Sequence, residues 1–402
     1  MNLFHLLAAR REAGRLVRAG LSGAGKFGSM FLAQVPTIPG LHVSVIADLN
    51  PARARRSCRT VGWDETRIAA TAFLDSGSAL AARDDVEVVI EATGSPSAGI
   101  LHARAAAAAG KHVVMVNVEA DVLAGPLLAD EARRAGVVYS LAYGDQPALT
   151  AELVDWARSS GFRVVAAGTK SAIEMAAIAN ACDLDVPSDG LCFPPCGVDD
   201  LAHVLRPRDA GGVLERTGMV EVVSSLERDS RPVFRDLRWG VYVVIEATTD
   251  YAAACFRQYG LKTDASGRYA AMYKPFHLIG MELSISVLSA ALRGEPTGAP
   301  TGFRGDVVAV AKRDIAAGET LDGEGGFTVW GKLLPAARSL ALSALPIGLA
   351  HGVAVNRHIA RGDVVPVSAV SGLPPGIHAV RREMEHRFAP SPSGREASHS
   401  LA

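Results

Sequence analysis

Short apolar runs alternate with amphipathic segments along the first 168 residues of the chain. The runs are rich in valine, isoleucine and alanine, and the segments between them show helical spacing of their apolar residues. Nearly continuous apolar strands separated by helices of about ten to fifteen residues predict a parallel sheet covered on both faces. The expected strands lie at residues 15–23, 41–48, 86–94, 111–117, 137–142 and 162–168. The expected helices lie at residues 26–35, 51–60, 97–110, 127–136 and 148–161, preceded by a short amphipathic helix with Leu3, Leu6 and Leu7 on one face.

The pattern changes after residue 168. We expect an α+β domain at residues 169–300, a small β-rich domain at 301–371 and a C-terminal tail at 372–402. Within the β-rich part, residues 306–321 and 352–370 repeat one pattern, in which an apolar strand is followed by a basic residue, Ile-Ala, glycine, an acidic residue and an apolar end. From about Ala389 the chain is rich in serine, proline and glycine, a composition that predicts disorder.

The composition narrows the class of protein. The 402 residues carry a net charge of −1, which offers no electrostatic footprint for nucleic acid or an anionic membrane. No apolar run reaches the roughly 20 residues that a membrane span requires. Five cysteines are too few, and an odd number, for a disulfide framework. We therefore expect a soluble, cytoplasmic protein.

A glycine-rich turn follows the first expected strand. The stretch "GLSGAGKFGSM" places Gly23, Gly25 and Gly28 in the G-x-G-x-x-G spacing of a dinucleotide-binding turn, and Lys26 and Phe27 lie within it. The helix that begins here would offer its free N–H groups to a pyrophosphate. The same loop also begins the pattern of a nucleoside-triphosphate loop, but Phe27 stands where the Mg²⁺-binding hydroxyl is required, so we reject that alternative.

Residues after the second strand bear on the choice of dinucleotide. Asp48 lies 20 residues after Gly28, where an acidic residue binds the adenosine ribose, and its charge favours NAD. Arg53 follows, with Asn50 and Arg55 nearby, and an arginine there can turn toward the 2′-phosphate of NADP. The sequence leaves this choice open.

Polar residues follow three further strands at the same edge of the sheet. Ligands bind at the carboxyl edge of such sheets, so these residues are candidates for the cofactor and substrate sites, although residues of the same types also cap helices. The cofactor-binding candidates are Thr93, Gly94, Asn117 and Glu119, and Asp145 is a candidate ligand of substrate or metal.

A lysine stands where the last of these strands meets a helix. Lys170, in "RVVAAGTKSAIEMAA", is placed to bind a phosphate or to polarise a carbonyl. Glu174 lies one helical turn further on, and pairing of the two would make both structural.

Two later stretches hold other candidates. In "MYKPFHLIGME", Pro275 suits a helix start, and Lys274 and His277 beside it are candidate substrate-site residues. In "CFPPCGVDDLAH", Cys192, Cys196 and His203 suggest zinc only weakly; Asp199 or Asp200 is a candidate proton acceptor, but capping of the following helix is favoured.

Taken together, these stretches resemble a known family. "GAGKFGSMFLAQV", "ADLNPARAR", "EATGSP", "KHVVMVNVEAD", "AYGDQPAL", "GTKSAIEMAAIANA", "FPPCGVDDL" and "YKPFHLIGMELSISVLSAALRGEPTG" are similar to the homoserine-dehydrogenase-like oxidoreductases with a C-terminal SAF domain, a group that includes the type II (DXR-like) 1-deoxy-D-xylulose 5-phosphate reductoisomerases. The resemblance runs from about Leu3 to Ser371.

The resemblance implies a fold, a cofactor and a reaction. It implies a dinucleotide-binding Rossmann domain at 1–168, a substrate domain at 169–300 and an SAF domain at 301–371 that caps the site or forms the interface of a homo-oligomer. It implies NADP or NAD, a small-molecule substrate and a divalent metal, Mg²⁺ or Mn²⁺, for which no ligands are indicated. The product of the reductoisomerase reaction would enter isoprenoid precursor synthesis.

The chain departs from the family at one place. In the family, a longer segment with its own lysine-containing motif separates the "VVAAG" strand from the "GTKSAIEM" helix, whereas here the two share Gly168. We therefore expect a shortened substrate domain. Three functions stay open: the reductoisomerase, a homoserine-dehydrogenase-like dehydrogenase of a sugar acid, polyol or hydroxy amino acid, and a cofactor-binding paralogue without catalysis.

Overall fold

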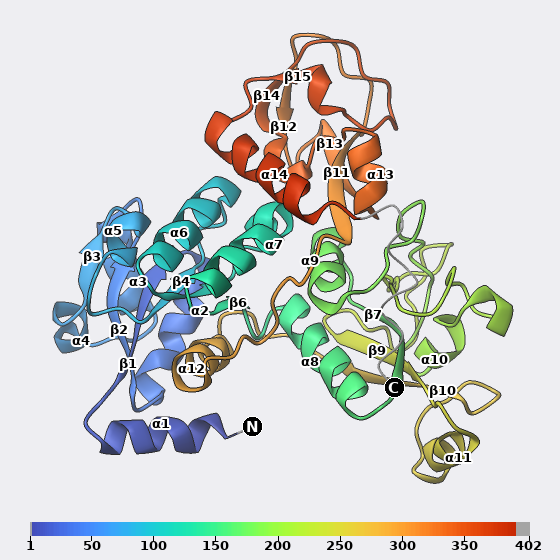
Figure 1. Cartoon of the computed structure of the whole chain (residues 1–402), viewed down its shortest axis with the longest axis horizontal. Coiled ribbons are helices and arrows are strands. Elements are labelled where there is room, and N and C mark those ends of the chain that lie inside the picture. The colour runs from blue at the N-terminus through green and yellow to red at the C-terminus, as the bar shows by residue number, and fades with distance from the viewer. Residues whose placement is uncertain (1, 391–402) are drawn as a thin grey trace.

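In the computed structural model, which describes residues 2–390, a six-stranded parallel sheet forms the first domain (Figure 1). Its strand order is β3-β2-β1-β4-β5-β6, so successive strands are added on one side of β1 up to β3 and on its other side from β4 onward. The strands are β1 (Val17–Ser22), β2 (Leu41–Ala47), β3 (Ala72–Leu74), β4 (Val88–Glu91), β5 (His112–Met115) and β6 (Tyr139–Leu141). The predicted α/β class is confirmed, because these strands are buried on both faces as their apolar sequences require.

Helices cover both faces of this sheet. They are α1 (Leu3–Glu12), α2 (Lys26–Gln34), α3 (Pro51–Thr60), α4 (Glu65–Ala69), α5 (Gly77–Ala81), α6 (Pro96–Ala108) and α7 (Val118–Arg134). In α1, Leu3 and Leu7 are buried, but Leu6 is exposed. Helix α7 begins nine residues earlier than predicted and contains Pro126. None of the helices within residues 2–390 has the length and apolarity needed to cross a membrane.

The predicted sixth strand of this sheet belongs to a different sheet, so that prediction was wrong. Strand β7 (Arg163–Gly168) pairs antiparallel with β9 (Val241–Glu246), in a second sheet of order β10-β9-β7-β8. An apolar strand sequence shows burial but not its pairing partner, which here lies more than 70 residues away. Strand β3, short and only half-buried, was not predicted.

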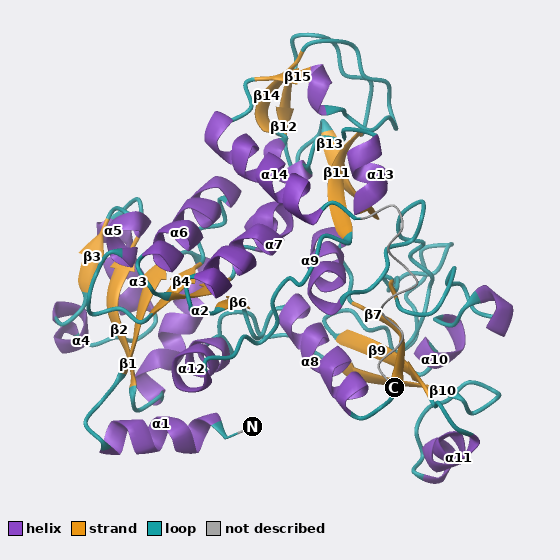
Figure 2. Cartoon of the chain, viewed as in Figure 1, coloured by secondary structure: helices purple, strands orange, loops and turns teal. Residues whose placement is uncertain are grey.

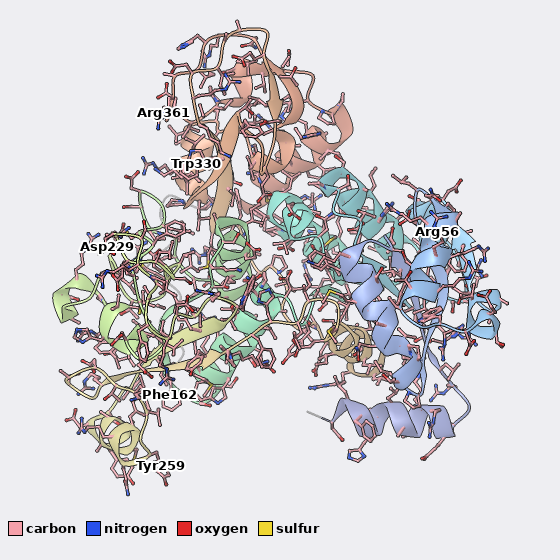
Figure 3. All side chains as sticks on the ribbon, turned by 180° about the vertical axis from the view of Figure 1, so that it is seen from behind. Arg56, Phe162, Asp229, Tyr259, Trp330 and Arg361 are labelled. Carbon is pink, nitrogen blue, oxygen red and sulfur yellow. The ribbon has the colours of Figure 1, made fainter. Side chains whose placement is uncertain are left out.

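The second sheet is the centre of the second domain. Strands β8 (Met219–Val220) and β10 (Tyr269–Lys274) complete it. Helices α8 (Gln146–Ser159) and α9 (Ala172–Cys182) pack beside it, and α10 (Leu201–Val204) contacts β9 and β10 (Figure 2). Helix α11 (Asp250–Gln258) stands out from the body of this domain, with Tyr259 near its tip (Figure 3).

The next helix returns to the first domain. Helix α12 (Ser284–Arg293), predicted as part of the substrate domain, packs instead against α1 and against strands β1, β4, β5 and β6. Its buried face, which includes Leu283 and Val287, joins the apolar cluster of the first sheet. Amphipathic spacing predicts the buried face of a helix but not the sheet that covers it.

The third domain is β-rich, as predicted. It contains β11 (Gly305–Ala311), β12 (Thr320–Asp322), β13 (Val329–Pro335), β14 (His351–Val355), β15 (Val370–Ser371), α13 (Ala336–Ala341) and α14 (Pro375–Phe388). The two copies of the predicted repeat pair with each other, because Ile315 and Ile359 exchange backbone hydrogen bonds of 2.9 and 3.0 Å. These isoleucines occupy equivalent positions in the two copies.

Helix α14 lies within the segment predicted as a tail, so that prediction was too broad. It packs along α7 of the first domain, and Figure 1 shows the third domain resting over α7 and α9. The buried Arg381 of α14 pairs with the buried Asp306 of β11 at 2.7 Å and donates to the carbonyl of Leu123 in α7 at 3.3 Å. The disorder predicted for residues 391–402 lies outside the described residues.

Replacement of Arg381 by methionine should lower the free energy of unfolding by about 3–5 kcal/mol, because it leaves the Asp306 carboxylate buried without a counter-charge. Chemical denaturation measures the effect. The neighbouring Arg382 is 71% exposed and serves as the control; its replacement by alanine should change the unfolding free energy by less than about 0.5 kcal/mol. Equal losses in the two variants would contradict the assignment.

Candidate active site

At two glycines of the turn between β1 and α2, the surrounding backbone leaves no space for a side chain. A Cβ on Gly23, whose φ is +95°, would lie 2.5 Å from the carbonyl oxygen of Ala92, and one on Gly28 would lie 2.2 Å from the carbonyl oxygen of Gly23. Around Gly25, by contrast, the space within 4 Å is open. The turn therefore packs closely on the protein side and leaves the N-terminus of α2 accessible, as a pyrophosphate site requires.

Asp48 is buried at the end of β2 and holds this turn. Its carboxylate accepts hydrogen bonds from the backbone of Ala24 (3.1 Å) and Asn50 (2.9 Å), and Arg53 donates to both of its oxygens at 2.8 Å. Burial acts to raise the pKa of Asp48, but the bonds from Arg53, Asn50 and Ala24 outweigh it and lower the pKa overall. The carboxylate is therefore ionised, and the half-exposed guanidinium of Arg53 covers it.

The candidates after β4 and β5 also lie at this edge. Thr93 and Gly94 form the exposed turn after β4, and Gly94 has a φ of +72° and open space where a side chain would be. Asn117 caps α7 by accepting a hydrogen bond from the backbone of Ala120 at 3.1 Å. Glu119, in the first turn of α7, faces a cavity.

That cavity has a volume of about 410 Å³ and lies where the first and second domains meet. It brings together six of the predicted residues, from the glycine-rich turn to the second domain. Its lining residues are Lys26, Phe27, Met30, Val116, Val118, Glu119, Asp145, Gln146, Lys170, Glu174, Trp239, His277 and Ile279.

One wall of the cavity carries three carboxyl groups. Asp145 is 5% exposed, caps α8 and accepts a hydrogen bond from the backbone of Gln146 at 2.8 Å. Burial raises its pKa to about 8, and the charges of Glu174 and Glu119 contribute to the shift. The pKa of Glu119 is also raised, by burial first and then by Glu174. At neutral pH, Asp145 therefore holds a proton inside the cavity.

The lining also includes a lysine, a histidine and an aromatic ring. The ammonium of Lys170 lies 3.5 Å from the centroid of the Trp239 ring. Burial and the nearby Arg238 lower the pKa of Lys170, against the opposing effect of Glu174. The His277 ring nitrogen Nδ1 lies 2.7 Å from the carbonyl oxygen of Trp239. The hypothesis of a Lys170–Glu174 pair finds no support, because the lysine stacks on the indole instead.

Lys274 was predicted beside His277, but the structure places it elsewhere. It ends β10, and its ammonium donates to Tyr143 (2.7 Å) and Glu152 (2.8 Å), outside the cavity. Burial alone would lower the pKa of Lys274, but these two partners raise it overall. The helix expected at Pro275 does not form, because the chain turns until α12 begins at Ser284.

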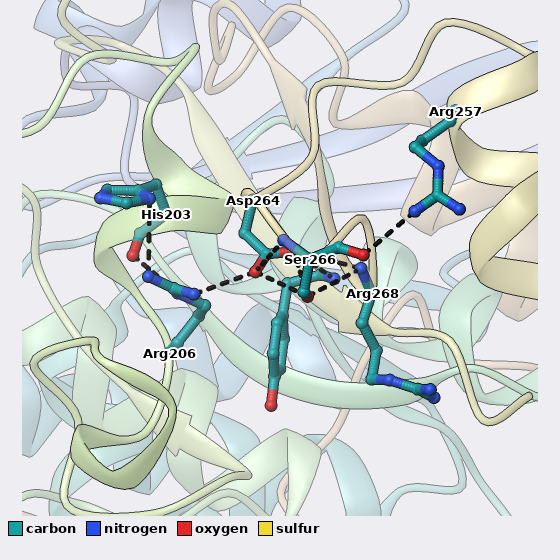
Figure 4. Close-up of polar contacts among 7 residues, drawn as sticks. His203, Arg206, Arg257, Asp264, Ser266 and Arg268 are labelled. Atoms are coloured by element: carbon teal, nitrogen blue, oxygen red, sulfur yellow. Dashed lines mark hydrogen bonds and ion pairs between the residues drawn. The ribbon is translucent and has the colours of Figure 1, made fainter. Parts of the chain in front are cut away.

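The zinc hypothesis finds no support. His203 contacts Arg206, which donates to its carbonyl oxygen at 2.9 Å and pairs with Asp264, in the polar network that Figure 4 shows. Cys192 is exposed and Cys196 is buried. Within residues 2–390, no three His, Cys, Asp or Glu side chains form a group that could hold a metal ion, so the predicted Mg²⁺ or Mn²⁺ has no ligand set there.

The two acidic residues before α10 lie at a helix cap and in an ion pair. Asp200 occupies the cap position of α10, although its side chain makes no capping bond. Asp199 pairs with Arg235 at 3.0 Å. Neither lines the cavity.

Sequence reasoning missed Trp239. The register of β7 and β9 places Tyr242 opposite Gly168, so residues just before β9 lie beside residues just after β7. Trp239 and Lys170 meet for this reason. Trp239 could have been predicted only from the pairing of β7 with β9, and the local sequence does not show that pairing.

Comparison with known proteins bears on the second domain. The protein-family model described as "Oxidoreductase DRL, catalytic domain" matches residues 166–283, which run from within β7 to the residue before α12. No curated protein matches the chain.

Several solved structures are similar at low identity. They include a probable dehydrogenase from Thermotoga maritima (14% identity, 69% of this chain and 90% of that chain covered, TM-score 0.41) and a putative oxidoreductase from Klebsiella pneumoniae (16%, 70% and 86%, TM-score 0.39). A third is myo-inositol dehydrogenase from Lactobacillus casei, solved with NAD(H) and myo-inositol (12%, 57% and 71%, TM-score 0.37). The family match covers less than half of the chain and shows that residues 166–283 are similar to an oxidoreductase catalytic domain.

Proposed function

We propose that the chain is an NAD(P)-dependent oxidoreductase that interconverts a carbonyl and a hydroxyl group on a small anionic substrate. One observation supports this most: the 410 Å³ cavity joins the N-terminus of α2, at the dinucleotide turn, to the protonated Asp145 and to Lys170. A cofactor at the turn and a substrate in the cavity would therefore share one enclosed space.

The residues present fit a dinucleotide. The turn at Gly23, Gly25 and Gly28 would hold the pyrophosphate, and Asp48 with Arg53 would hold the adenosine ribose. When bound, the nicotinamide supplies a hydride to a carbonyl carbon or accepts one from the carbon that bears a hydroxyl. Lys26, Phe27, Thr93, Gly94, Asn117 and Glu119 would border the rest of the cofactor.

Asp145 would carry the proton that balances the hydride. In reduction, the substrate oxygen gains a proton as the carbon gains the hydride, and in oxidation it loses one. A carboxyl group with a pKa of about 8 suits both directions near neutral pH. Burial is the main cause that favours the protonated form of Asp145, and the charges of Glu174 and Glu119 add to it.

Lys170 and His277 would bind the anionic group of the substrate. Lys170 is exposed, lies over the Trp239 ring and would be able to turn from the indole to a phosphate or carboxylate. 1-Deoxy-D-xylulose 5-phosphate, the substrate implied by the resemblance, belongs to this class. A sugar acid or a hydroxy amino acid is the second candidate, since each carries an anionic group, a carboxylate in place of the phosphate.

Two assays separate the possible functions. Purified protein is titrated with NADPH and NADH, and cofactor consumption is then followed with 1-deoxy-D-xylulose 5-phosphate and with a panel of sugar acids, polyols and hydroxy amino acids. Turnover of the first substrate supports the reductoisomerase, and turnover of another supports a dehydrogenase. Binding without any turnover would favour the non-catalytic paralogue.

Replacement of Asp145 by asparagine should lower kcat by about 10²- to 10⁴-fold, because the amide cannot supply the proton. Asparagine also caps helices, so α8 should remain folded. In the wild type, the reduction rate should fall as pH rises through about 8, since Asp145 loses its proton there, and the oxidation rate should rise.

Replacement of Glu174 by glutamine is a second, independent test of the role of Asp145. It removes a charge that raises the pKa of Asp145, so the pH at which the reduction rate falls should move lower. A pH profile unchanged in this variant, or near-normal kcat in the asparagine variant, would rule out the role of Asp145.

Arg53 should set the preference between the two dinucleotides. Replacement by alanine leaves the Asp48 carboxylate uncovered, so the Kd for NADPH should rise by roughly tenfold while that for NADH rises less. Fluorescence titration measures both constants. Arg56, on the outer face of α3 (Figure 3), is the control and should change neither. Equal affinity for NADPH with and without Arg53 would contradict this role.

Replacement of Lys170 by alanine should leave the Kd for the cofactor within about twofold and raise the KM for the anionic substrate by roughly tenfold. The exposed Lys262, in the loop after α11, provides a control of the same type. Loss of cofactor binding in the Lys170 variant would instead show that this lysine supports the fold.

A further inference from the structure

Glu91, the last residue of β4, is a fully buried carboxylate that the proposed chemistry does not use. It is 0% exposed, and it lies directly before the Ala92–Gly94 turn that borders the cofactor edge. An ionised group in such a place is costly unless its surroundings stabilise it.

Its first oxygen organises that turn. The Glu91 Oε1 atom accepts a hydrogen bond from the Thr93 hydroxyl at 2.5 Å and a longer one from the Thr93 backbone at 3.3 Å. The Thr93 Oγ1 atom in turn accepts from the backbone of Ser95 at 3.4 Å. One carboxylate oxygen therefore fixes the position of Thr93 and, through it, the start of α6.

A histidine also lies beside this carboxylate oxygen. The Nδ1 atom of His102, on α6, lies 3.3 Å from Glu91 Oε1 and 3.2 Å from the Ser22 hydroxyl. Ser22 is the last residue of β1, immediately before Gly23 of the glycine-rich turn. The Glu91–His102 pair therefore connects the ends of the two strands whose loops border the cofactor.

Glycines make room for this arrangement. A Cβ on Gly77 would lie 2.4 Å from the His102 ring, so the imidazole occupies the space of a missing side chain. On the other side, a Cβ on Gly23 would lie 2.9 Å from the Cα of Thr93. The Thr93 turn is thus held between the carboxylate of Glu91 and the first glycine of the dinucleotide motif.

The second oxygen of Glu91 faces the next strand. Within residues 2–390, neither Glu91 Oε2 nor Asn117 Nδ2 has a hydrogen-bond partner, although both are buried. The two atoms lie 3.3 and 3.1 Å from the point where a Cβ on Gly99 would stand. The Glu91 acceptor and the Asn117 donor, neither of which is hydrogen-bonded, therefore lie on the same side of Gly99, beside the end of β5.

We infer that Glu91 and His102 form a positioning pair for the cofactor: they hold the Thr93–Gly94 turn in the shape that admits the dinucleotide. The inference rests on the proposed function and adds residues that do not themselves touch substrate. Its consequence is that cofactor affinity depends on a polar contact between Glu91 and His102 behind the binding surface.

Four variants test the inference, with Kd for NADPH and NADH, kcat at saturating cofactor, and Tm as readouts. Replacement of Glu91 by glutamine removes the charge, and Thr93→Val removes the hydroxyl that Glu91 holds. Thr93→Ser retains the hydroxyl, and Arg104→Gln is a control on the same helix, where Arg104 pairs with Glu131 instead.

The expected result is a rise of roughly tenfold in Kd for Glu91→Gln and Thr93→Val, with kcat at saturating cofactor within about twofold of wild type. Arg104→Gln should bind like wild type, and Thr93→Ser, which keeps the hydroxyl, should bind the dinucleotide severalfold more tightly than Thr93→Val. If the role were purely structural, the variants would have a lower Tm, and Kd would not rise selectively while kcat at saturating cofactor stayed unchanged.

Several outcomes would overturn the inference. If wild type binds a dinucleotide and Glu91→Gln binds it equally well, the positioning role is wrong while the proposed function stands. If Glu91→Gln does not fold, the Thr93 pair decides: equal affinities for the valine and serine variants overturn the role. If wild type binds neither dinucleotide, the proposed function fails, and the inference fails with it.

Discussion

The burial of one carboxyl group, Asp145, beside two half-buried ones, Glu119 and Glu174, is the constraint on which the site depends. Asp145, Glu119 and Glu174 face one cavity, and together with burial their charges raise the pKa of Asp145 to about 8. A carboxyl group with this pKa keeps its proton at neutral pH and can still exchange it, so the cavity contains a protonated acid there. Lys170 and His277, which we propose bind the anionic group of the substrate, line the same cavity.

The fold assembles this cavity from separate parts of the chain. Glu119 lies on helix α7 of the first domain, and Asp145 caps helix α8. Glu174 lies on helix α9, which follows β7. The third domain rests on α7 and α9 together, with Arg381 joining β11 to α7 (Figure 1). It therefore contacts both helices that carry Glu119 and Glu174, and its role as a cap of the substrate site stays a prediction.

Local chemistry explains which positions the sequence could predict. It pointed to the glycine-rich turn and to Asp48 because a pyrophosphate site requires particular residues at fixed spacing, and to Asp145 because polar residues after parallel strands meet at one edge; their roles stay predictions. Pairings between distant segments explain the misses. The sheet joined by β7 depends on β9, the partner of Lys274 is Glu152, and Trp239 reaches Lys170 only through the β7–β9 register. The importance of Glu91 likewise required His102, 11 residues away, to be seen beside it.

A structure of the protein with NADPH bound tests the central claim most directly, because the claim is that cofactor and substrate share one cavity. The account predicts that the nicotinamide ring lies beside Lys26 and Phe27, with its reactive carbon facing Asp145 and Lys170. A nicotinamide ring that points away from these two residues, or a dinucleotide bound elsewhere on the chain, would contradict it.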